Sequence, residues 1–526
     1  MKRTAWHWLI PILVLGLLLA MLSLNGHLVA GGDNATYMIL GQSLATGQGY
    51  RMVNDPRLPE MALYPPGYPL LLAAIVKLTA TSRNLGTAVF PMKLVSVALY
   101  LACIALAYVL LSRRSARLAP VATLLLAVSP QILHFATEIS TEMPYLLLSL
   151  SALLLFEGAS REQGPTVNQI ALTATCLALA FYVRSIALVM VAAFGLHLLA
   201  RRRLGHAVLL VVAVVVLAVP WFIHSGRLPA TGVSVGLGRG YFALYLSGDP
   251  YGTAQASAPE LVSRLVFNLR MYAVHIWPDA LFPHALSAMT RLGRAGYVFP
   301  LLVSLLALLG FLIELRRGFA SEWYVALFFV SCVGYIWAQS RLIVPIIPFV
   351  LFYLCSAIDS IAKWVWKGRN GPSTYALALA CGMIALSLLL ATARQIGHNL
   401  RFGMGHSTAT YYSQDPVWAN YWQSMDWIAR ANAPGAVAMC RKADLLYVLT
   451  GHPSLEYPYS PDALELKRSV RENRVAYVIE DAFRWTPTTV DYLKPALQAW
   501  RAAEPGALDL AFETSAPQTR VWRVNP

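Results

Sequence analysis

The chain has 526 residues, of which 57% are hydrophobic and 13% are charged, and its mean hydropathy is +0.55. Soluble globular proteins carry about 25% charged residues, so this composition excludes an ordinary soluble protein and predicts one that crosses a membrane many times. The net charge of +15 does not indicate nucleic-acid binding, because most Lys and Arg residues lie in short links between apolar segments, where they set membrane topology.

Eleven apolar segments are candidate membrane spans, although several are shorter than the roughly 20 residues that a perpendicular helix needs. Leu70–Leu78 is too short to span and is expected to lie along the surface or to re-enter. No cleavage site follows the first apolar run, so we expect that span to be retained. The predicted spans are Trp8–Leu28, Val89–Leu111, Leu118–Phe135, Met143–Phe156, Val167–Val183, Ser185–Ala200, Leu204–Phe222, Gly296–Ile313, Ala320–Ala338, Leu342–Ala362 and Ser373–Ala393.

The basic residues between these spans predict the orientation of the chain. If all eleven spans alternate, the basic links fall on one side, which the positive-inside rule identifies as the cytoplasm. The prediction is therefore a multi-pass protein of the bacterial inner membrane, with a cytoplasmic N-terminus and an extracytoplasmic tail. The basic residues that support it are Lys2, Arg3, Arg113, Arg114, Arg117, Arg161, Arg201, Arg202, Arg203, Arg316, Arg317, Lys363, Lys367 and Arg369.

A change of composition near residue 395 predicts two domains. Residues 1–394 form a transmembrane domain, all α-helical, with outward loops at 29–88 and 223–295, and residues 395–526 form a soluble α/β domain. No nucleotide loop, metal cluster or nucleophile motif occurs in the tail, so we expect it to dock the acceptor or act as a lid. Its predicted elements are helices at Tyr421–Asn432 and Ser460–Glu472 and strands at Ala436–Cys440, Leu445–Leu449, Ala476–Ile479 and Arg520–Val524.

Asp33 is the leading catalytic candidate. It follows two glycines at the end of the first apolar segment, and a short helical pattern, Ala35–Ala45, comes after it. The rigid bend Tyr64–Pro69 lies further along the same loop. Asp33 has two interpretations: a general base that deprotonates an attacking hydroxyl, or a cap for the helix that follows.

Four further charged residues lie in turns that the topology assigns to the outer face: Glu138, Glu142, Arg184 and Arg341. We expect them to converge with Asp33 on one cavity. An arginine held at bilayer depth costs roughly 2.5–3.5 kcal/mol or more, so it needs a carboxylate or a bound phosphate as partner, or it snorkels to the lipid headgroups. Glu142 is alternatively a first-turn acid that the helix dipole favours.

Several segments follow one another along the chain: GGDNATYMILGQSLATGQGY, YPPGYPLLLAAIVKL, TEMPYLLLSLSALLLF, YVRSIALVM, PWFIHSG and SRLIVPIIPFVLFYL. Taken in this order, they resemble the C-type glycosyltransferases of family 39, which include protein O-mannosyltransferases and the aminoarabinose transferases that modify lipid A. The resemblance extends from Trp8 to Ala362, and the tail resembles the periplasmic α/β domain of some bacterial members.

The resemblance implies an enzyme that takes a sugar from a polyprenyl phosphate on the outer side of the membrane and passes it to a hydroxyl with inversion. Asp33 matches the family's first-loop catalytic acid, and Glu142 matches the acid of the later outward loop. The family often has a second acid directly after the first, and this chain has Asn34 there. This chain therefore lacks the second acid at that position.

The chain also departs from the family near the double proline, where aminoarabinose transferases carry Glu-Lys and this chain has Leu63-Tyr64. That removes a metal-ligand candidate and a phosphate-contacting lysine from their usual positions. Glu60 and Lys93 are candidate substitutes.

In the predicted site, Asp33 lies on the outer face of the membrane beside a lipid-linked sugar donor. Arg341, Arg184 or Lys93 would hold the phosphate of that donor, and Glu138 and Glu60 would lie near the substrate. The sequence identifies no cofactor, and a divalent metal is left as an alternative. The partners are the polyprenyl-linked donor, a cell-envelope acceptor and membrane lipid, without nucleic acid. Aromatic residues that are candidates for stacking on sugars, or for an interfacial belt, are Tyr37, Tyr64, Tyr68, Trp221 and Tyr241.

Two other functions stay open. A glycolipid transporter or flippase would share the many spans and intramembrane arginines, but transporters usually show two related halves, and no such repeat is found. A non-catalytic assembly protein of the cell envelope, which binds a partner through its tail, is the other alternative.

Overall fold

The computed structural model describes residues 7–30, 32–79, 81, 84–158, 164–228, 243–248, 255–283, 291, 293–367, 370–403, 405–431, 435–484 and 487–525. The chain divides into two compact units. The first, here called the helical unit, comprises Met1–Leu24, Lys93–His224 and Gly240–Leu400. The second, here called the mixed unit, comprises Asn25–Met92, Ser225–Arg239 and Arg401–Pro526.

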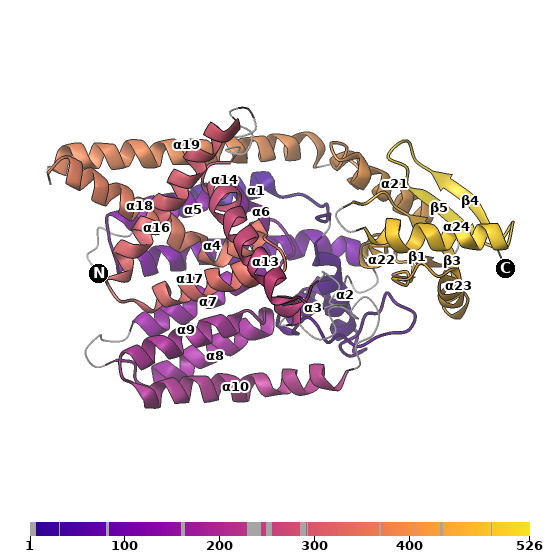
Figure 1. The fold of residues 1–526 in the computed structure, drawn as a ribbon, viewed down its shortest axis with the longest axis horizontal. Helices are drawn as coiled ribbons and strands as arrows, with labels where there is room; N and C mark the ends of the chain where they lie inside the picture. The colour runs from indigo at the N-terminus through magenta and orange to yellow at the C-terminus, as the bar shows by residue number, and fades with distance from the viewer. Residues whose placement is uncertain are drawn as a thin grey trace. The chain divides into compact units, whose positions relative to one another are not determined.

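The helical unit consists of apolar helices joined by short turns (Figure 1). All eleven predicted spans coincide with helices, and three of these helices, α4, α10 and α19, continue into the mixed unit. The helices are α1 (Leu9–Ser23), α4 (Val89–Ser112), α5 (Leu118–Ala127), α6 (Pro130–Ala136), α7 (Glu142–Glu157), α8 (Val167–Val183), α9 (Ala187–Ala200), α10 (Leu204–Arg227), α12 (Ala243–Leu246), α13 (Ala258–Met271), α14 (Trp277–Leu281), α16 (Val298–Leu315), α17 (Ala320–Gly334), α18 (Ile347–Val365) and α19 (Asn370–Phe402), with a π-helical turn η3 (Tyr272–Ile276) and 3₁₀ turns η4 (Gly293–Tyr297) and η5 (Ser340–Ile346).

Five segments within the described residues are long and apolar enough to cross a membrane. The pair α5 and α6 makes a sixth if it forms one span, and it bends by 60°. The bend lies at Pro130, which disfavours helical geometry at the preceding residue and cannot donate the next main-chain hydrogen bond. The other predicted spans are shorter helices, so the count of eleven spans stays a prediction. The five segments are Leu85–Ser112, Leu204–Arg227, Ala295–Leu315, Ser340–Val365 and Gly371–Phe402.

Small residues allow close helix packing in both units. A Cβ added to Gly310 of α16 would lie 1.8 Å from the main-chain oxygen of Tyr353 in α18. No other residue fits that position without moving the two helices apart, which is the usual reason for glycine at apolar helix contacts. Gly41 has a similar place in the mixed unit, where its Cβ would lie 3.0 Å from Leu72.

A buried ion cluster ties together one end of the helical unit. Arg114, in the turn after α4, donates to Glu322 of α17 at 2.6 Å and lies 3.4 Å from Glu157 of α7. Its guanidinium also stacks over Phe319. Because all of these charges are buried, removing one partner would leave an uncompensated charge, which costs several kcal/mol. The predicted topology assigns this end to the cytoplasm.

The mixed unit contains a five-stranded sheet and the helices around it. Its helices are α2 (Asn34–Ala45), α3 (Gly67–Thr79), η2 (Leu85–Ala88), α20 (Thr408–Tyr411), α21 (Pro416–Arg430), α22 (Ala443–Thr450), α23 (Ala463–Glu472), η6 (Thr489–Leu493) and α24 (Lys494–Ala503). Its strands are β1 (Val437–Met439), β2 (Ser454–Leu455), β3 (Val475–Glu480), β4 (Leu508–Glu513) and β5 (Arg520–Val524), in the order β2-β1-β3-β5-β4. The first three of these are parallel, and the β3–β5 and β5–β4 pairs are antiparallel.

Helices cover both faces of this sheet (Figure 1). Trp427 of α21 stacks on Phe512 and meets the ring of Tyr477 edge-on, so α21 covers one face. On the other face, Val478 and Trp522 belong to the buried cluster that includes residues of α23 and α24. The alternation of side chains along β3 thus fills two cores, and the prediction of an α/β tail is confirmed.

One predicted strand is wrong. Leu445–Leu449 lies within α22, not in the sheet. A run of five apolar residues fits a strand or a buried helix equally well, and its flanking residues decide. Asp444 precedes the run at the helix start, and Gly451 follows it with φ of +72°, which ends the helix in the left-handed conformation.

Other differences concern elements that the sequence pattern did not show. The strands β2 and β4 and the helix α24 were not predicted. The long link 223–295 carries α12, α13 and α14 in its described part. The proposed domain boundary at 394/395 falls inside α19, and the mixed unit includes residues 25–92 beside the tail. The division at residue 395 stays a prediction.

Candidate functional site

Glu142, at the start of α7, joins two arginines in the helical unit. Arg184 Nη1 donates to Glu142 Oε1 at 2.8 Å, and Arg341 Nε donates to the same oxygen. The carboxylate is fully buried, whereas the side chains of Arg184 and Arg341 are 15% and 27% exposed. We call Arg184 and Arg341 the arginine pair. Both guanidiniums are partly exposed, and the planar fork of a guanidinium binds phosphate or carboxylate oxygens, so the arginine pair suits an anionic ligand.

Local structure explains how these three side chains meet. Glu142 occupies the first turn of α7, just before Pro144, where an acid and a proline both favour the helix start. Arg184 ends α8 in an extended conformation, and Arg341 lies in the 3₁₀ turn before α18. The carboxylate that each arginine was expected to need is therefore Glu142. Glu142 is at once a first-turn acid and an ion-pair partner.

Lys93 and Glu138 form a separate pair in the same unit. Lys93 Nζ lies 3.1 Å from Glu138 Oε2 and 3.2 Å from Oε1, and the lysine side chain is fully buried in α4. The lysine side chain has no exposed surface, whereas both arginines are partly exposed. Lys93 is thus a weaker candidate for a phosphate contact than the arginine pair, and its predicted role stays a prediction.

Asp33 lies in the mixed unit at the N-cap position of α2, and its side chain makes no capping hydrogen bond to that helix. Asn34 organises the turn, because its Oδ1 accepts from the Ala35 amide at 2.8 Å and its Nδ2 donates to the Val29 carbonyl at 3.0 Å. The carboxylate is therefore not committed to capping, and the residue that replaces the family's second acid has a structural task.

Hydrogen bonds from the tail hold the Asp33 segment within the mixed unit. Lys442 Nζ donates to the carbonyl of Gly32, the residue bonded to Asp33, at 3.3 Å. Thr36 Oγ1 donates to Asp444 Oδ2 at 2.8 Å. The Tyr412 hydroxyl donates to the Leu28 carbonyl at 2.9 Å and accepts from the Ala30 amide at 3.0 Å.

Sequence reasoning missed these tail residues. The contacts join positions that are 382 to 410 residues apart in the chain. Neither periodicity nor spacing contains a signal for such pairs.

Three of the aromatic candidates pack against one another in the mixed unit, and their predicted contact with sugars stays a prediction. Tyr37 and Tyr68 are 4% and 2% exposed, and the Tyr37 ring meets Tyr64 and Tyr68 edge-on at 5.0 and 5.2 Å between centroids. They pack α2 against α3. Trp221 is buried in α10, and Tyr241 lies outside the described residues.

Glu60 forms a surface pair with Arg51 at 2.8 Å. Within the described part of the chain, no group of three or more His, Cys, Asp or Glu side chains is arranged to hold a metal. No residue set in the described chain therefore suggests where a metal would bind.

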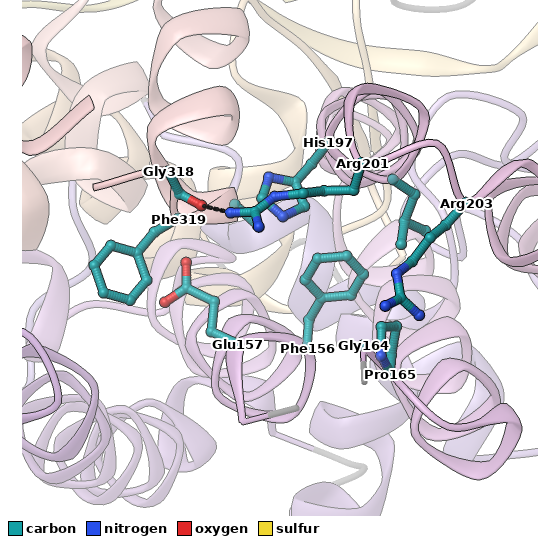
Figure 2. Close-up of a pocket in the computed structure, with 11 residues that line it drawn as sticks. Phe156, Glu157, Gly164, Pro165, His197, Arg201, Arg203, Gly318 and Phe319 are labelled. Carbon is teal, nitrogen blue, oxygen red and sulfur yellow. Dashed lines mark hydrogen bonds between the residues drawn. The ribbon is translucent and has the colours of Figure 1, made fainter. Parts of the chain in front are cut away.

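A small cavity lies elsewhere in the helical unit, lined by residues of α7, α9 and α17 and of the turns beside them (Figure 2). Its volume is about 70 Å³, and Arg201 donates across it to the Gly318 carbonyl at 3.0 Å. Ligand pockets for sugars or cofactors usually measure about 300–1,000 Å³. None of the predicted site residues lines this cavity, so it is not the candidate site.

Comparison with known proteins identifies the fold. Residues 64–224 match the family model described as dolichyl-phosphate-mannose-protein mannosyltransferase. The structure of ArnT from Cupriavidus metallidurans bound to undecaprenyl phosphate is similar, with a TM-score of 0.59, 15% identity and 99% of each chain covered. The apo state of that protein gives a TM-score of 0.56, 14% identity and full coverage of both chains.

An oligosaccharyltransferase from Archaeoglobus fulgidus is similar as well, with a TM-score of 0.55, 12% identity, and coverage of 91% of this chain and 70% of its own. No match was found among curated protein sequences. The resemblance to the C-type glycosyltransferases is therefore confirmed, by the fold of the whole chain and by the sequence of residues 64–224.

Proposed function

We propose that the chain is an integral-membrane glycosyltransferase that moves a sugar from a polyprenyl-phosphate donor to a hydroxyl of a cell-envelope acceptor. The observation that carries this proposal is the arginine pair on Glu142, two partly exposed guanidiniums that share one buried carboxylate in a chain with this fold. Such a group is suited to the phosphate of a lipid-linked donor. The structure of ArnT with undecaprenyl phosphate supports the choice of donor class.

The proposed reaction is an inverting single displacement. The acceptor oxygen attacks the anomeric carbon, the bond from that carbon to the phosphate oxygen breaks, and the polyprenyl phosphate leaves with the electron pair. Asp33 takes the proton of the acceptor hydroxyl as general base. The arginine pair stabilises the negative charge that develops on the leaving phosphate. Glu142 orients both guanidiniums.

The proposal places this reaction on the outer face of the bacterial inner membrane. The candidate charged groups lie in turns that the positive-inside rule assigns to that side. No Gly-rich phosphate loop of a nucleotide-sugar enzyme occurs in the sequence. A lipid-linked donor fits a compartment without nucleotide sugars.

The test is the variant Asp33→Asn in the full chain, reconstituted in nanodiscs and assayed with undecaprenyl-phosphate-linked sugars and membranes that supply the acceptor. We expect transfer to fall by about 10²- to 10⁴-fold, the usual contribution of a general base. Binding of undecaprenyl phosphate should be unchanged. Glu465→Gln, on the exposed face of α23, is the matched control and should retain transfer.

The alternatives give other outcomes in the same assay. A flippase or an assembly protein would show no transfer in the native chain, and its lipid movement or partner binding would not depend on the Asp33 carboxylate. Full transfer by Asp33→Asn would overturn the proposed role of Asp33.

A further inference from the structure

A polar groove runs along α21 in the mixed unit, with α20 and the residues around it as its second wall. Its volume is about 760 Å³, which falls within the range of small-molecule and cofactor sites. Nothing in the proposed reaction uses it so far. The residues that line it are Ser407, Ala409, Thr410, Ser413, Pro416, Ala419, Asn420, Gln423, Asp426, Ala429 and Arg430.

The chemistry of this lining points to a neutral, hydroxylated ligand. Seven of the described lining residues carry hydroxyl, amide, carboxylate or guanidinium groups, and the apolar ones are three alanines and a proline. There is no large apolar side chain among them to seat an acyl chain. One acid, Asp426, and one base, Arg430, balance each other, so the lining favours neither an anion nor a cation.

The amphipathic sequence of α21 builds the groove. Trp422, Met425 and Ile428 are buried in the core of the tail. Gln423, Asp426 and Arg430 are spaced by three and four residues, so they share the opposite face and point their polar groups into the groove. Desolvation raises the pKa of the Asp426 carboxyl above its usual range, against the opposing effect of Arg430.

The second wall is fixed to the segment that leads to Asp33. Thr408 Oγ1 lies 3.1 Å from His27 Nδ1, and the His27 ring stacks on Tyr411 at 4.7 Å between centroids. Asn25 Nδ2 donates to the Tyr411 hydroxyl at 3.3 Å. The groove and the catalytic candidate thus belong to one packed unit, and five residues separate His27 from Asp33 in the sequence.

We propose that this groove is an acceptor subsite that holds a neutral glycan chain whose free hydroxyl is presented for transfer. The inference rests on the proposed function and deepens it, because it selects a glycan from among lipid, protein and glycan acceptors. Planar amide and carboxylate groups hydrogen-bond the hydroxyls of sugars, and the alanines allow the chain to lie close to the helix.

The test uses the full chain in nanodiscs and saturation-transfer NMR with three linear neutral probes: mannotetraose, galactotetraose and arabinotetraose. We expect at least one probe to bind. The double variant Gln423→Ala/Asp426→Ala should weaken that binding by about tenfold or more, since it removes two hydrogen-bonding side chains. Ala429→Trp, which fills the groove without removing a polar group, should block it too. Arg468→Ala, on the exposed face of α23, is the control and should bind normally.

Two results would overturn the inference: no binding of any of the three probes, or equal binding by the native chain and both groove variants. The groove variants should keep undecaprenyl phosphate binding. If Asp33→Asn abolishes transfer while no probe binds, the groove inference fails and the proposed function stands. If a probe binds in the groove while Asp33→Asn transfers normally, the proposed catalytic role fails and the groove stands.

Discussion

Arg184 and Arg341 donate to one oxygen of Glu142, and both guanidiniums keep part of their surface exposed. The pair of Lys93 with Glu138 differs, because the lysine side chain there is fully buried. The partly exposed guanidiniums of the arginine pair can contact a ligand. Two guanidiniums this close together repel each other, and the buried carboxylate of Glu142 offsets that repulsion by pairing with both.

The variant Arg341→Ala removes one of the two guanidiniums and leaves Glu142 paired with Arg184. We expect the affinity for undecaprenyl phosphate to fall by about 10- to 100-fold, because charge-assisted hydrogen bonds contribute about 1.5–3 kcal/mol each. Arg341→Lys should be intermediate, since it keeps the charge and loses the planar fork. Microscale thermophoresis with the full chain in nanodiscs measures the affinity for undecaprenyl phosphate, and Arg468→Ala is the control. Equal affinity in the native chain and Arg341→Ala would contradict the phosphate role.

Asp481 follows β3 and is 1% exposed. Burial raises the pKa of its carboxyl to about 6, although hydrogen bonds from the Phe483 amide and the Thr489 hydroxyl oppose this shift. A raised pKa in the folded state stabilises the fold below the pKa of the unfolded chain, and this contribution is lost as pH rises through the folded pKa.

The stability of the tail should therefore fall by up to about 3 kcal/mol between pH 4 and pH 6 because of this group. Hydrogen exchange of β3 peptides in the full chain, corrected for intrinsic rates, measures the local free energy of unfolding. In Asp481→Asn, the local free energy of unfolding should depend less on pH between pH 4 and pH 6. An unchanged pH dependence in the variant would show that another group is responsible.

At the scale of single residues, the sequence predicted the candidates better than their partners. A charged residue at the end of an apolar run is visible in the sequence, which is why Asp33, Glu142, Arg184 and Arg341 were selected. That Arg341 would share an oxygen with Arg184 depends on the packing of α7 against η5, which no local pattern encodes. The pairing of Lys93 with Glu138 was missed for the same reason.

Secondary-structure elements were predicted most closely where a long apolar run has clear limits. The predicted span Val167–Val183 has the bounds of α8, which begins with a capping box at Thr166 and Gln169. Short elements were less predictable. The apolar run in α22 fits a strand as well as a helix, and the strand prediction there was wrong. The strand β2 has two residues, which are too few to show any periodicity.

The contact between α2 and α22 couples the tail to the catalytic candidate. Thr36, three residues after Asp33, donates to Asp444 in the first turn of α22. This contact restrains the turn from which the Asp33 side chain projects. Asp444 is therefore a positioning residue in the proposed reaction.

We expect Thr36→Val and Asp444→Ala each to lower kcat by about tenfold, since each removes one hydrogen bond to a charged group, with little change in undecaprenyl phosphate binding. The double variant should be no worse than either single one, because both changes remove the same contact. Asp444→Asn keeps an acceptor oxygen and should recover most of the activity. Additive effects of the two single changes would contradict the coupling.

For the whole molecule, the composition and the charge pattern predicted a multi-pass membrane protein, and the comparisons confirm the fold. Composition and charge did not predict that the first loop and the tail fold as one unit. Residues 25–92 and 401–526 share hydrogen bonds, such as that from Lys442 to Gly32, and a packed boundary. Composition marks where apolar segments end, but it does not show which distant polar segments pack together.

The proposed function requires that Asp33 and the arginine pair act on one lipid-linked donor. A structure of the full chain with undecaprenyl phosphate bound is the decisive measurement. We expect phosphate density against Arg341 and Arg184, with the Asp33 carboxylate facing it across a space that a single sugar ring would fill. Phosphate bound away from both arginines, or an Asp33 carboxylate on the opposite face of the membrane, would contradict it.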